Sequence, residues 1–311
     1  MLENLLIRTT SLLSRCLKNR VNILTETKRI TVLGAGLMGH GIAQVAAQIG
    51  KYEVNLRDIE QRFIDSGMNM IRESLQRFVK KGQLKEAEMN EILARIHPML
   101  DLKEAVSNAD LVIEAAPESI ELKKAILKEV DSHVRPHTII ASNTSSVSIT
   151  EMAAATKRPE KVCGMHFFNP PQLMKLVEVI KGAKTSDETV QTVLAVAHKM
   201  EKETVLVKKD SPGFIVNRIL IPALNEAVAI YWEGIAERDD IDKAIKLGLN
   251  WPMGPLMLLD YIGTDTTLAV AEVLTKELDP KFHPTTGLKQ MAKAQLLGRK
   301  TGKGFYDWTQ K

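Results

Sequence analysis

A histidine and a glutamate twelve positions apart are the residues of this sequence best suited to acid–base chemistry. His166 lies in the mostly apolar run CGMHFF, and Glu178 lies in the run LVEVI. A neutral imidazole can take a proton from a substrate hydroxyl, and a carboxylate beside it can orient the ring and stabilise its protonated form. Because a histidine on a strand is more often a hydrogen-bonded core residue, this interpretation depends on the rest of the chain.

The residues between His166 and Glu178 predict how the two could meet. Asn-Pro-Pro at 169–171 must reverse the chain, because a residue before proline is pushed toward extended conformations and proline has no N–H for a strand ladder. Residues 173–180 then predict a second strand. We expect a strand, a stiff turn and a strand to bring the Glu178 carboxylate within hydrogen-bond reach of the His166 ring.

A glycine-rich turn further upstream predicts a dinucleotide cofactor. GAGLMG at 34–39 has the pattern G-x-G-x-x-G between an apolar run at 30–33 and helix-forming residues at 42–47. The first glycine permits the tight turn, the second lets backbone approach a pyrophosphate and the third lets helix pack on strand, while the helix N-terminus offers N–H groups to phosphates. The turn residues expected to bind the cofactor are Gly34, Gly36, Leu37, Met38 and Gly39.

Asp58 follows the predicted second strand, at 52–56, and favours NAD over NADP. An acid at this place can bind both ribose hydroxyls and repels a 2′-phosphate. Arg57 and Arg62 flank it and could instead bind a 2′-phosphate, so NADP stays open as the weaker alternative.

Polar residues follow two further predicted strands, at 111–116 and 138–141. Glu118 and Lys123 come after the first, and SNTSS at 142–146 comes after the second. Since ligands of an open α/β sheet bind beyond the carboxyl ends of its strands, we expect these residues near the cofactor. Helix capping accounts for one or two of the five small polar residues, not for all of them.

Two regions depart from the α/β pattern. A polar helical stretch at about 62–95, broken near Lys80-Lys81-Gly82, predicts an inserted helical hairpin. Its basic end could meet an anionic ligand, and a solvated face of mixed charge explains the same residues equally well. From residue 211 onward the pattern is helical, with Pro212 expected to start a helix and with amphipathic runs at 219–229, 239–246 and 265–278.

Composition excludes several classes of protein. The 311 residues, 44% hydrophobic and 26% charged, are typical of a globular protein with two domains. The formal charge of +4 comes mostly from residues 1–28, and the near-neutral remainder has no nucleic-acid footprint. Two distant cysteines without metal-ligand spacing predict neither a disulfide framework nor a metal site, and no apolar run approaches the roughly twenty residues of a membrane span.

Residues 1–28 form an N-terminal extension or leader. They are rich in Arg and Leu and poor in acids, a pattern that resembles an organelle transit peptide and that also suits a loosely held extension. We therefore expect a cytoplasmic protein, with the mitochondrial matrix as the alternative if this segment is a transit peptide.

Taken together, these motifs resemble the 3-hydroxyacyl-CoA dehydrogenases. The resemblance rests on GAGLMG, Asp58, SNTSS, HFFNP and Glu178, and continues through DSPGFIVNR at 210–218, PMGP at 252–255 and residues 298–305. It implies an α/β protein with a Rossmann-like NAD-binding domain at 29–209, which contains the inserted hairpin. An all-α domain at 210–311 is then expected to bind substrate and to form a homodimer.

The resemblance also implies the reaction and the role of each residue. The reaction is reversible NAD-dependent oxidation of (S)-3-hydroxyacyl-CoA to 3-oxoacyl-CoA, as in fatty-acid β-oxidation or butyryl-CoA-type metabolism. His166 is implied as the base and Glu178 as its orienting partner, with Ser145 and Asn217 hydrogen-bonding the substrate. Residues implied along NAD are Glu118, Lys123, Asn143, Ser145, Asn169 and Lys300, with Lys303 as a neighbouring candidate for the last; those implied for coenzyme A are Ser74, Lys81 and Ser145.

Two alternatives remain at this point. One is a related sugar-acid dehydrogenase, of the gulonate or lambda-crystallin type, on the same scaffold. The other is a non-catalytic protein that binds NAD or acyl-CoA. Phe167-Phe168 with Ser74 and Lys81 favour an acyl-CoA substrate over a sugar acid, and a retained set of acid–base residues argues against a protein without catalysis.

Overall fold

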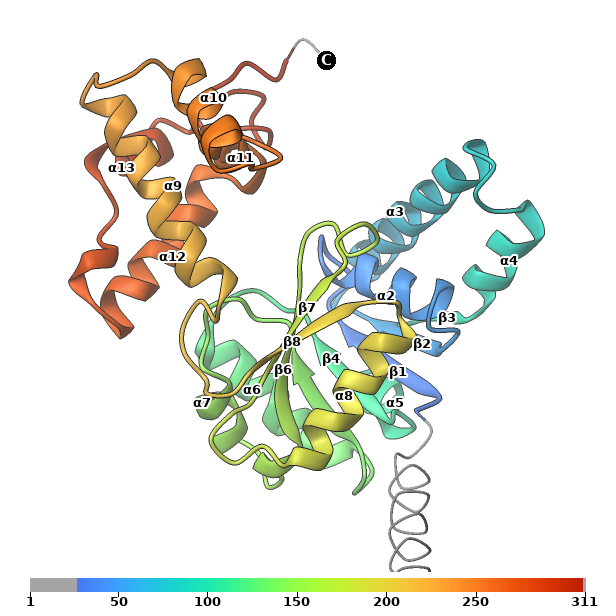
Figure 1. Cartoon of the computed structure of the whole chain (residues 1–311). Helices are drawn as coiled ribbons and strands as arrows, with labels where there is room; N and C mark the ends of the chain where they lie inside the picture. Colours follow the sequence, from blue (N-terminus) through green and yellow to red (C-terminus); the bar gives the residue numbers. More distant parts are fainter. Residues whose placement is uncertain (1–26, 310–311) are drawn as a thin grey trace, which may run out of the picture. The chain divides into compact units, whose positions relative to one another are not determined.

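The computed structural model describes residues 27–309, and eight strands in this part of the chain form one sheet (Figure 1). The strand order is β3-β2-β1-β4-β5-β6-β7-β8. Neighbouring strands are parallel except for β6 and β7, which are antiparallel. The strands are β1 (Arg29–Leu33), β2 (Glu53–Arg57), β3 (Ile96–Met99), β4 (Leu111–Glu114), β5 (Ile139–Ser142), β6 (Val162–Phe167), β7 (Leu176–Ile180) and β8 (Glu203–Val207).

The central strands are apolar because helices pack on the sheet. β4, β5 and β6 are buried along their whole length, as parallel strands covered on both faces are. On one face, side chains such as Val32 and Met165 pack with Ile42 of α2 and Val193 of α8 in a single hydrophobic core. The helices of this unit are α2 (Gly39–Gln48), α3 (Gln61–Lys80), α4 (Glu86–Ala94), α5 (Leu102–Ser107), α6 (Ile120–His133), α7 (Ile149–Ala154) and α8 (Asp187–Lys199), with a 3₁₀ turn η1 (Pro159–Lys161).

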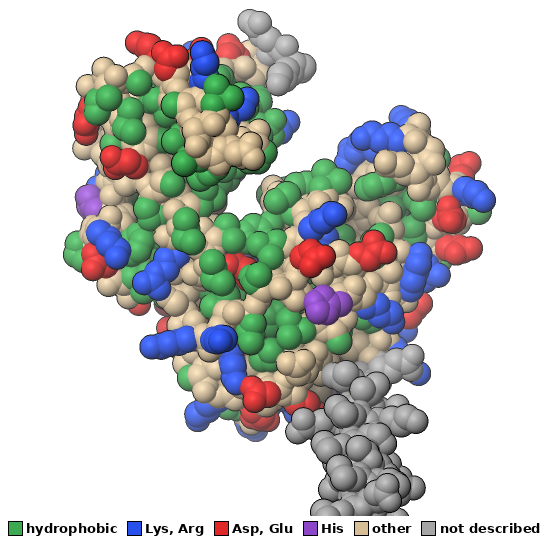
Figure 2. Space-filling view, in the orientation of Figure 1, with side chains coloured by type: hydrophobic (Ala, Val, Ile, Leu, Met, Phe, Trp, Pro, Cys, Tyr) green, Lys and Arg blue, Asp and Glu red, His purple; other side chains and the backbone are tan. Residues whose placement is uncertain are grey.

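The expected helical hairpin is present as α3 and α4. Ile64, Ile71 and Leu75 form the buried stripe of α3, and the rest of that helix is largely polar. The chain leaves α3 through Lys81 and then Gly82, whose φ of 69° lies in the left-handed region that glycine tolerates best. Figure 2 shows basic side chains grouped at the end of this hairpin and acidic ones along α4.

The second unit is helical and is described here by itself. It contains α9 (Val216–Trp232), α10 (Arg238–Gly248), α11 (Pro255–Ile262), α12 (Thr264–Glu277), the 3₁₀ turn η2 (Pro280–Phe282) and α13 (Thr286–Lys293). Its core joins α9, α11 and α13 through side chains that include Leu224, Leu259 and Leu288. Packing assigns residues 211–309 and the short segment Ser145–Ser148 to this unit, and residues 27–144 and 149–210 to the first.

The prediction that Pro212 starts a helix is wrong. The first helix of the second unit starts at Val216. Gly213 and Phe214 have φ angles of 73° and 49°, which an α-helix cannot contain, so the chain turns before it becomes helical. Two predicted strands are also shorter than expected, since β4 ends at Glu114 and β7 begins at Leu176.

Two predictions concern features that the described residues test only in part. No helix within residues 27–309 is long and apolar enough to cross a membrane. In the same residues, no group of three or more His, Cys, Asp or Glu side chains is placed to hold a metal ion. The expected leader lies almost wholly outside the described part, which begins at Thr27.

Candidate functional site

His166 and Glu178 meet across the antiparallel β6–β7 pair. They are directly opposed in the strand register, and His166 Nδ1 lies 2.7 Å from Glu178 Oε2. Glu178 is fully buried and His166 is 6% exposed. A carboxylate only accepts hydrogen bonds, so Nδ1 holds the ring proton and Nε2 is the basic nitrogen. The predicted hydrogen-bond contact between these two side chains is confirmed.

Phe168 and Asn143 surround the imidazole from two sides of the chain. The rings of His166 and Phe168 have centroids 4.7 Å apart. Asn143 follows β5, and its Oδ1 accepts a hydrogen bond of 2.8 Å from the Phe167 backbone N–H. This bond ties the loop after β5 to the residue beside His166, so the two neighbouring strand ends hold one another in place.

The glycine turn has room for a ligand at one position only. A Cβ on Gly34 would lie 2.7 Å from the Ala115 carbonyl oxygen, and a Cβ on Gly39 would lie 1.7 Å from that of Gly34. A Cβ on Gly36 would meet no atom within 4 Å. Gly34 and Gly39 therefore serve the strand–helix packing, whereas the Gly36 backbone is open to an approaching group, as a pyrophosphate requires. Leu37, next to it, is 62% exposed.

Asp58 links the end of β2 to the glycine turn. Its Oδ2 accepts from Ala35 N and its Oδ1 accepts from Ile59 N, each at 2.7 Å. The two neighbouring arginines have partners inside the protein: Arg57 Nε donates to the Leu100 carbonyl oxygen at 3.0 Å, and Arg62 pairs with Glu60 at 2.7 Å. A carboxylate flanked by occupied arginines suits a ribose with free hydroxyls, and the cofactor is NAD.

A buried ion pair, absent from the sequence prediction, lies at the carboxyl end of β4. Glu114 is fully buried and Lys123 is 1% exposed, and Lys123 Nζ lies 2.8 Å from Glu114 Oε1. Lys123 also donates to the Ala116 carbonyl oxygen at 2.9 Å, while Glu114 accepts from Ser142 Oγ at 2.5 Å. The only sequence signal for this pair was a charged residue at the end of the apolar strand LVIE.

Glu118 continues this polar cluster toward the surface. Its Oε2 accepts from Thr144 Oγ1 at 2.6 Å and lies 3.8 Å from Lys123 Nζ. The Glu118 side chain is 40% exposed, in contrast to the buried Lys123. Of the two charged residues predicted beside the cofactor, Glu118 is therefore the accessible one.

A pocket of about 380 Å³ in the first unit brings three predicted residues together. Ser74 and Lys81 reach it from the hairpin, and Asn169 reaches it from the β6–β7 turn. Arg77 adds a second cation, and His40 lines the wall with its Nδ1 2.8 Å from the Gly36 carbonyl oxygen. Burial lowers the pKa of His40, so this ring is neutral at physiological pH.

The other predicted residues belong to the second unit, and their roles stay predictions. Asn217 lies in the first turn of α9, and Ser145 lies in the segment Ser145–Ser148. Lys300 Nζ donates to Asp265 Oδ1 at 2.8 Å and to Thr266 Oγ1 at 2.7 Å.

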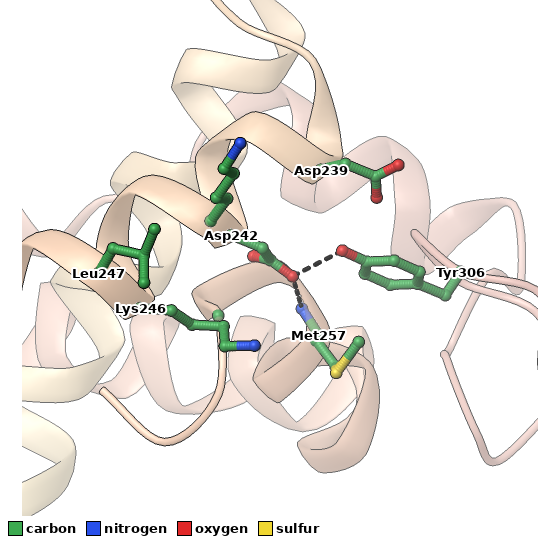
Figure 3. Close-up of a pocket in the computed structure, with 8 residues that line it drawn as sticks. Asp239, Asp242, Lys246, Leu247, Met257 and Tyr306 are labelled. Atoms are coloured by element: carbon green, nitrogen blue, oxygen red, sulfur yellow. Dashed lines mark hydrogen bonds between the residues drawn. The ribbon is translucent and has the colours of Figure 1, made fainter. Parts of the chain in front are cut away.

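A second pocket, of about 280 Å³, contains none of the predicted residues (Figure 3). Asp242 lies at its centre, where Oδ2 accepts from Tyr306 OH at 2.7 Å and from Met257 N at 3.0 Å. Its Oδ1 accepts from Leu256 N, so the carboxylate caps the first turn of α11. We assign this pocket to the packing of the helical unit.

Comparison with known proteins gives matches over nearly the whole chain. Residues 29–211 match the family model described as 3-hydroxyacyl-CoA dehydrogenase, NAD binding domain, and residues 213–308 match that of the 3-hydroxyacyl-CoA dehydrogenase C-terminal domain. A probable 3-hydroxybutyryl-CoA dehydrogenase of Bacillus subtilis (strain 168) is 48% identical over 287 residues, covering 92% of this chain and 99% of that one. The mitochondrial hydroxyacyl-coenzyme A dehydrogenase of Sus scrofa is 42% identical over 289 residues, covering 90% and 91%.

Solved structures agree with these matches. The crystal structure of (S)-3-hydroxybutyryl-CoA dehydrogenase from Ralstonia eutropha aligns with a TM-score of 0.86 at 45% sequence identity. The alignment covers 92% of this chain and 100% of that chain. The likeness therefore extends through both units.

Proposed function

The chain belongs to the 3-hydroxyacyl-CoA dehydrogenase family and is an NAD-dependent oxidoreductase, and from this premise we propose that His166 is its general base, oriented by Glu178. The observation that carries the proposal is the 2.7 Å contact between His166 Nδ1 and the fully buried Glu178 carboxylate. It leaves Nε2 as the proton acceptor.

The proposed reaction separates a hydride from a proton. NAD, when bound, accepts the hydride that leaves C3 of the 3-hydroxyacyl group. His166 Nε2 accepts the proton of the 3-hydroxyl, and the electron pair of that O–H bond forms the ketone. Glu178 stabilises the resulting imidazolium, which is a charge in a buried place and needs a nearby carboxylate. Ser145 and Asn217 hydrogen-bond the reacting oxygen in this proposal.

The residues that would hold NAD follow from the first unit. The open backbone at Gly36 would approach the pyrophosphate, and Asp58 would bind the ribose hydroxyls. Glu118 and Asn169, which are both accessible, are proposed as direct contacts. Lys123 is proposed to act through Glu118, because its ammonium is buried against Glu114. Asn143, Ser145 and Lys300 complete the proposed set.

The pocket beside the hairpin is proposed to bind the coenzyme A part of the substrate. Arg77 and Lys81 supply two cations for its phosphate groups, and Ser74 supplies a hydroxyl. A sugar acid has no phosphate-bearing group for such a pocket, so this feature favours acyl-CoA. The similar proteins named 3-hydroxybutyryl-CoA dehydrogenase support a short acyl chain and a place in β-oxidation or butyryl-CoA-type metabolism.

Assembly and location are proposed on weaker grounds. Large apolar side chains are exposed on the second unit, among them Ile219 at 69% and Leu247 at 77%, which supports a homodimer formed through this unit. We propose a cytoplasmic location; the mitochondrial alternative depends on residues 1–28. Light scattering of the purified protein tests the dimer, and mass spectrometry of the native N-terminus tests the leader.

His166→Gln tests the proposed base directly. We expect kcat for acetoacetyl-CoA reduction, followed by NADH absorbance, to fall about 10²-fold or more, while the NADH dissociation constant stays within about threefold. His97→Gln is the matched control, because His97 lies on the same sheet and pairs with Glu53 away from the site. A variant with most of its kcat would reject the assignment, and a wild-type protein inactive on every acyl-CoA would favour a non-catalytic binding protein.

A further inference from the structure

A buried lysine holds the turn between β6 and β7 from behind. Lys202 follows α8 and is 7% exposed. Its Nζ donates to the Pro171 carbonyl oxygen at 2.6 Å and to the Met174 carbonyl oxygen at 2.8 Å. Burial lowers the pKa of Lys202. Lysine is rarely buried to this degree, so two carbonyl partners in one turn require an explanation.

The turn has few backbone hydrogen bonds of its own. Pro170 and Pro171 have no N–H, and the N–H groups of Leu173 and Met174 both donate to the Pro170 carbonyl oxygen, each at 3.0 Å. Without Lys202, the carbonyl oxygens of Pro171 and Met174 would lose these bonds, and buried backbone oxygens are costly to leave unpaired.

Helix α2 fixes the opposite side of the same turn. Gln172 Nε2 donates to Gln44 Oε1 at 3.0 Å. A Cβ on Gly41 would lie 2.8 Å from Pro171 Cδ, so only glycine lets the helix and the turn pack this closely. The turn is thus held between α2 on one side and a single ammonium group on the other.

This turn is a wall of the pocket that contains Ser74 and Lys81. Asn169, Pro170, Gln172 and Leu173 all line that pocket. We propose that Lys202 is a positioning residue, which fixes this wall and thereby sets the affinity for the coenzyme A part of the substrate. The inference rests on the proposed function of the pocket, and it adds a residue that touches neither substrate nor cofactor.

Kinetics of Lys202→Met test the proposal. Methionine keeps the length of the side chain and removes the donor. We expect KM for acetoacetyl-CoA to rise about tenfold and kcat to change by less than about threefold, with the pH profile of kcat unaltered. Lys208→Met is the matched control, since Lys208 is exposed a few residues further on. Lys202→Arg, which can still donate to both carbonyls, should recover most of the affinity.

Hydrogen exchange gives a readout that needs no ligand. In Lys202→Met we expect the amides of Leu173 and Met174 to exchange about tenfold faster or more, while those of β4 keep their protection. If this variant does not fold, Lys202→Gln, which keeps a donor, is measured in the same way and must show smaller changes in the same direction. Unchanged exchange, or a fall in kcat without a change in KM, overturns the inference.

A third variant separates failure of the inference from failure of the proposed function. Faster exchange with an unchanged KM in Lys202→Met also overturns the inference. Lys81→Ala then shows which assignment failed: a raised KM keeps the pocket as the coenzyme A site and rejects only the role of Lys202, whereas a normal KM rejects the pocket as well.

Discussion

His166 Nδ1 lies 2.7 Å from Glu178 Oε2 because the two residues are directly opposed in an antiparallel strand pair. Side chains alternate between the faces of a sheet, so a slip of one residue in register would turn Glu178 to the other face. The regular ladder on both sides of this pair, from Gly164 opposite Ile180 to Phe167 opposite Val177, prevents such a slip. The orientation of the base is therefore built into the sheet rather than into a loop.

Glu178→Gln should separate orientation from binding. The neutral amide no longer stabilises an imidazolium, so we expect kcat to fall about 10²-fold or more at neutral pH. The NADH dissociation constant, measured by fluorescence, should stay within about threefold of the wild-type value. Glu53→Gln, which removes the carboxylate partner of His97 elsewhere on the sheet, serves as control. A Glu178→Gln protein with more than a tenth of the wild-type kcat would contradict the orienting role.

Asp58→Ser should weaken the preference for NAD. Loss of the carboxylate removes both the acceptor for the ribose hydroxyls and the repulsion of a 2′-phosphate. We expect kcat/KM for NAD to fall about tenfold or more and the ratio of NAD to NADP efficiency to fall further. Arg57→Ala is the control and should leave that ratio unchanged, because Arg57 donates to the Leu100 carbonyl oxygen. An unaltered ratio in Asp58→Ser would remove this residue from cofactor selection.

Features written in short stretches of sequence were predictable. The glycine turn, the α3–α4 hairpin and the two strands around Asn169-Pro170-Pro171 each depend on residues close together in the chain. The edge strands β3 and β8 were missed. β3 has the sequence IHPM with a proline in it, which an edge strand tolerates but which hides the strand pattern. β8 is largely exposed, so it lacks the apolar run of a central strand.

Contacts between distant residues could not be predicted from periodicity. Lys202 meets the carbonyl of Pro171 thirty-one positions earlier in the chain, and nothing near either residue indicates the contact. Glu114 was visible as a charge in an apolar strand, but its pairing with Lys123 requires the position of α6 relative to β4. The start of α9 at Val216 instead of Pro212 depends on the left-handed backbone of Phe214, a residue type that rarely adopts it.

Cys163 should be almost inert to alkylation in the folded protein. It is fully buried on β6, and burial raises its pKa to about 12. At pH 8 it therefore has roughly a thousandfold less thiolate than a group titrating at pH 9. In a Cys16→Ser background, we expect slow reaction with iodoacetamide that speeds up as pH rises, and rapid reaction only after unfolding in urea. Rapid stoichiometric labelling of the native protein at pH 8 would contradict the burial of this thiol.

The Glu114–Lys123 pair should show strong coupling in stability. Both side chains are buried, at 0% and 1% exposure, so removing one partner leaves an uncompensated charge inside the protein. We expect Glu114→Gln and Lys123→Met each to lower the free energy of unfolding by about 3–5 kcal/mol in urea titrations. The double variant should lose at least about 2 kcal/mol less than the sum, because no lone charge remains. As control, Lys124→Met breaks the exposed pair with Glu151 and should cost under about 1 kcal/mol. Additive losses in the double variant would show that the two charges do not depend on each other.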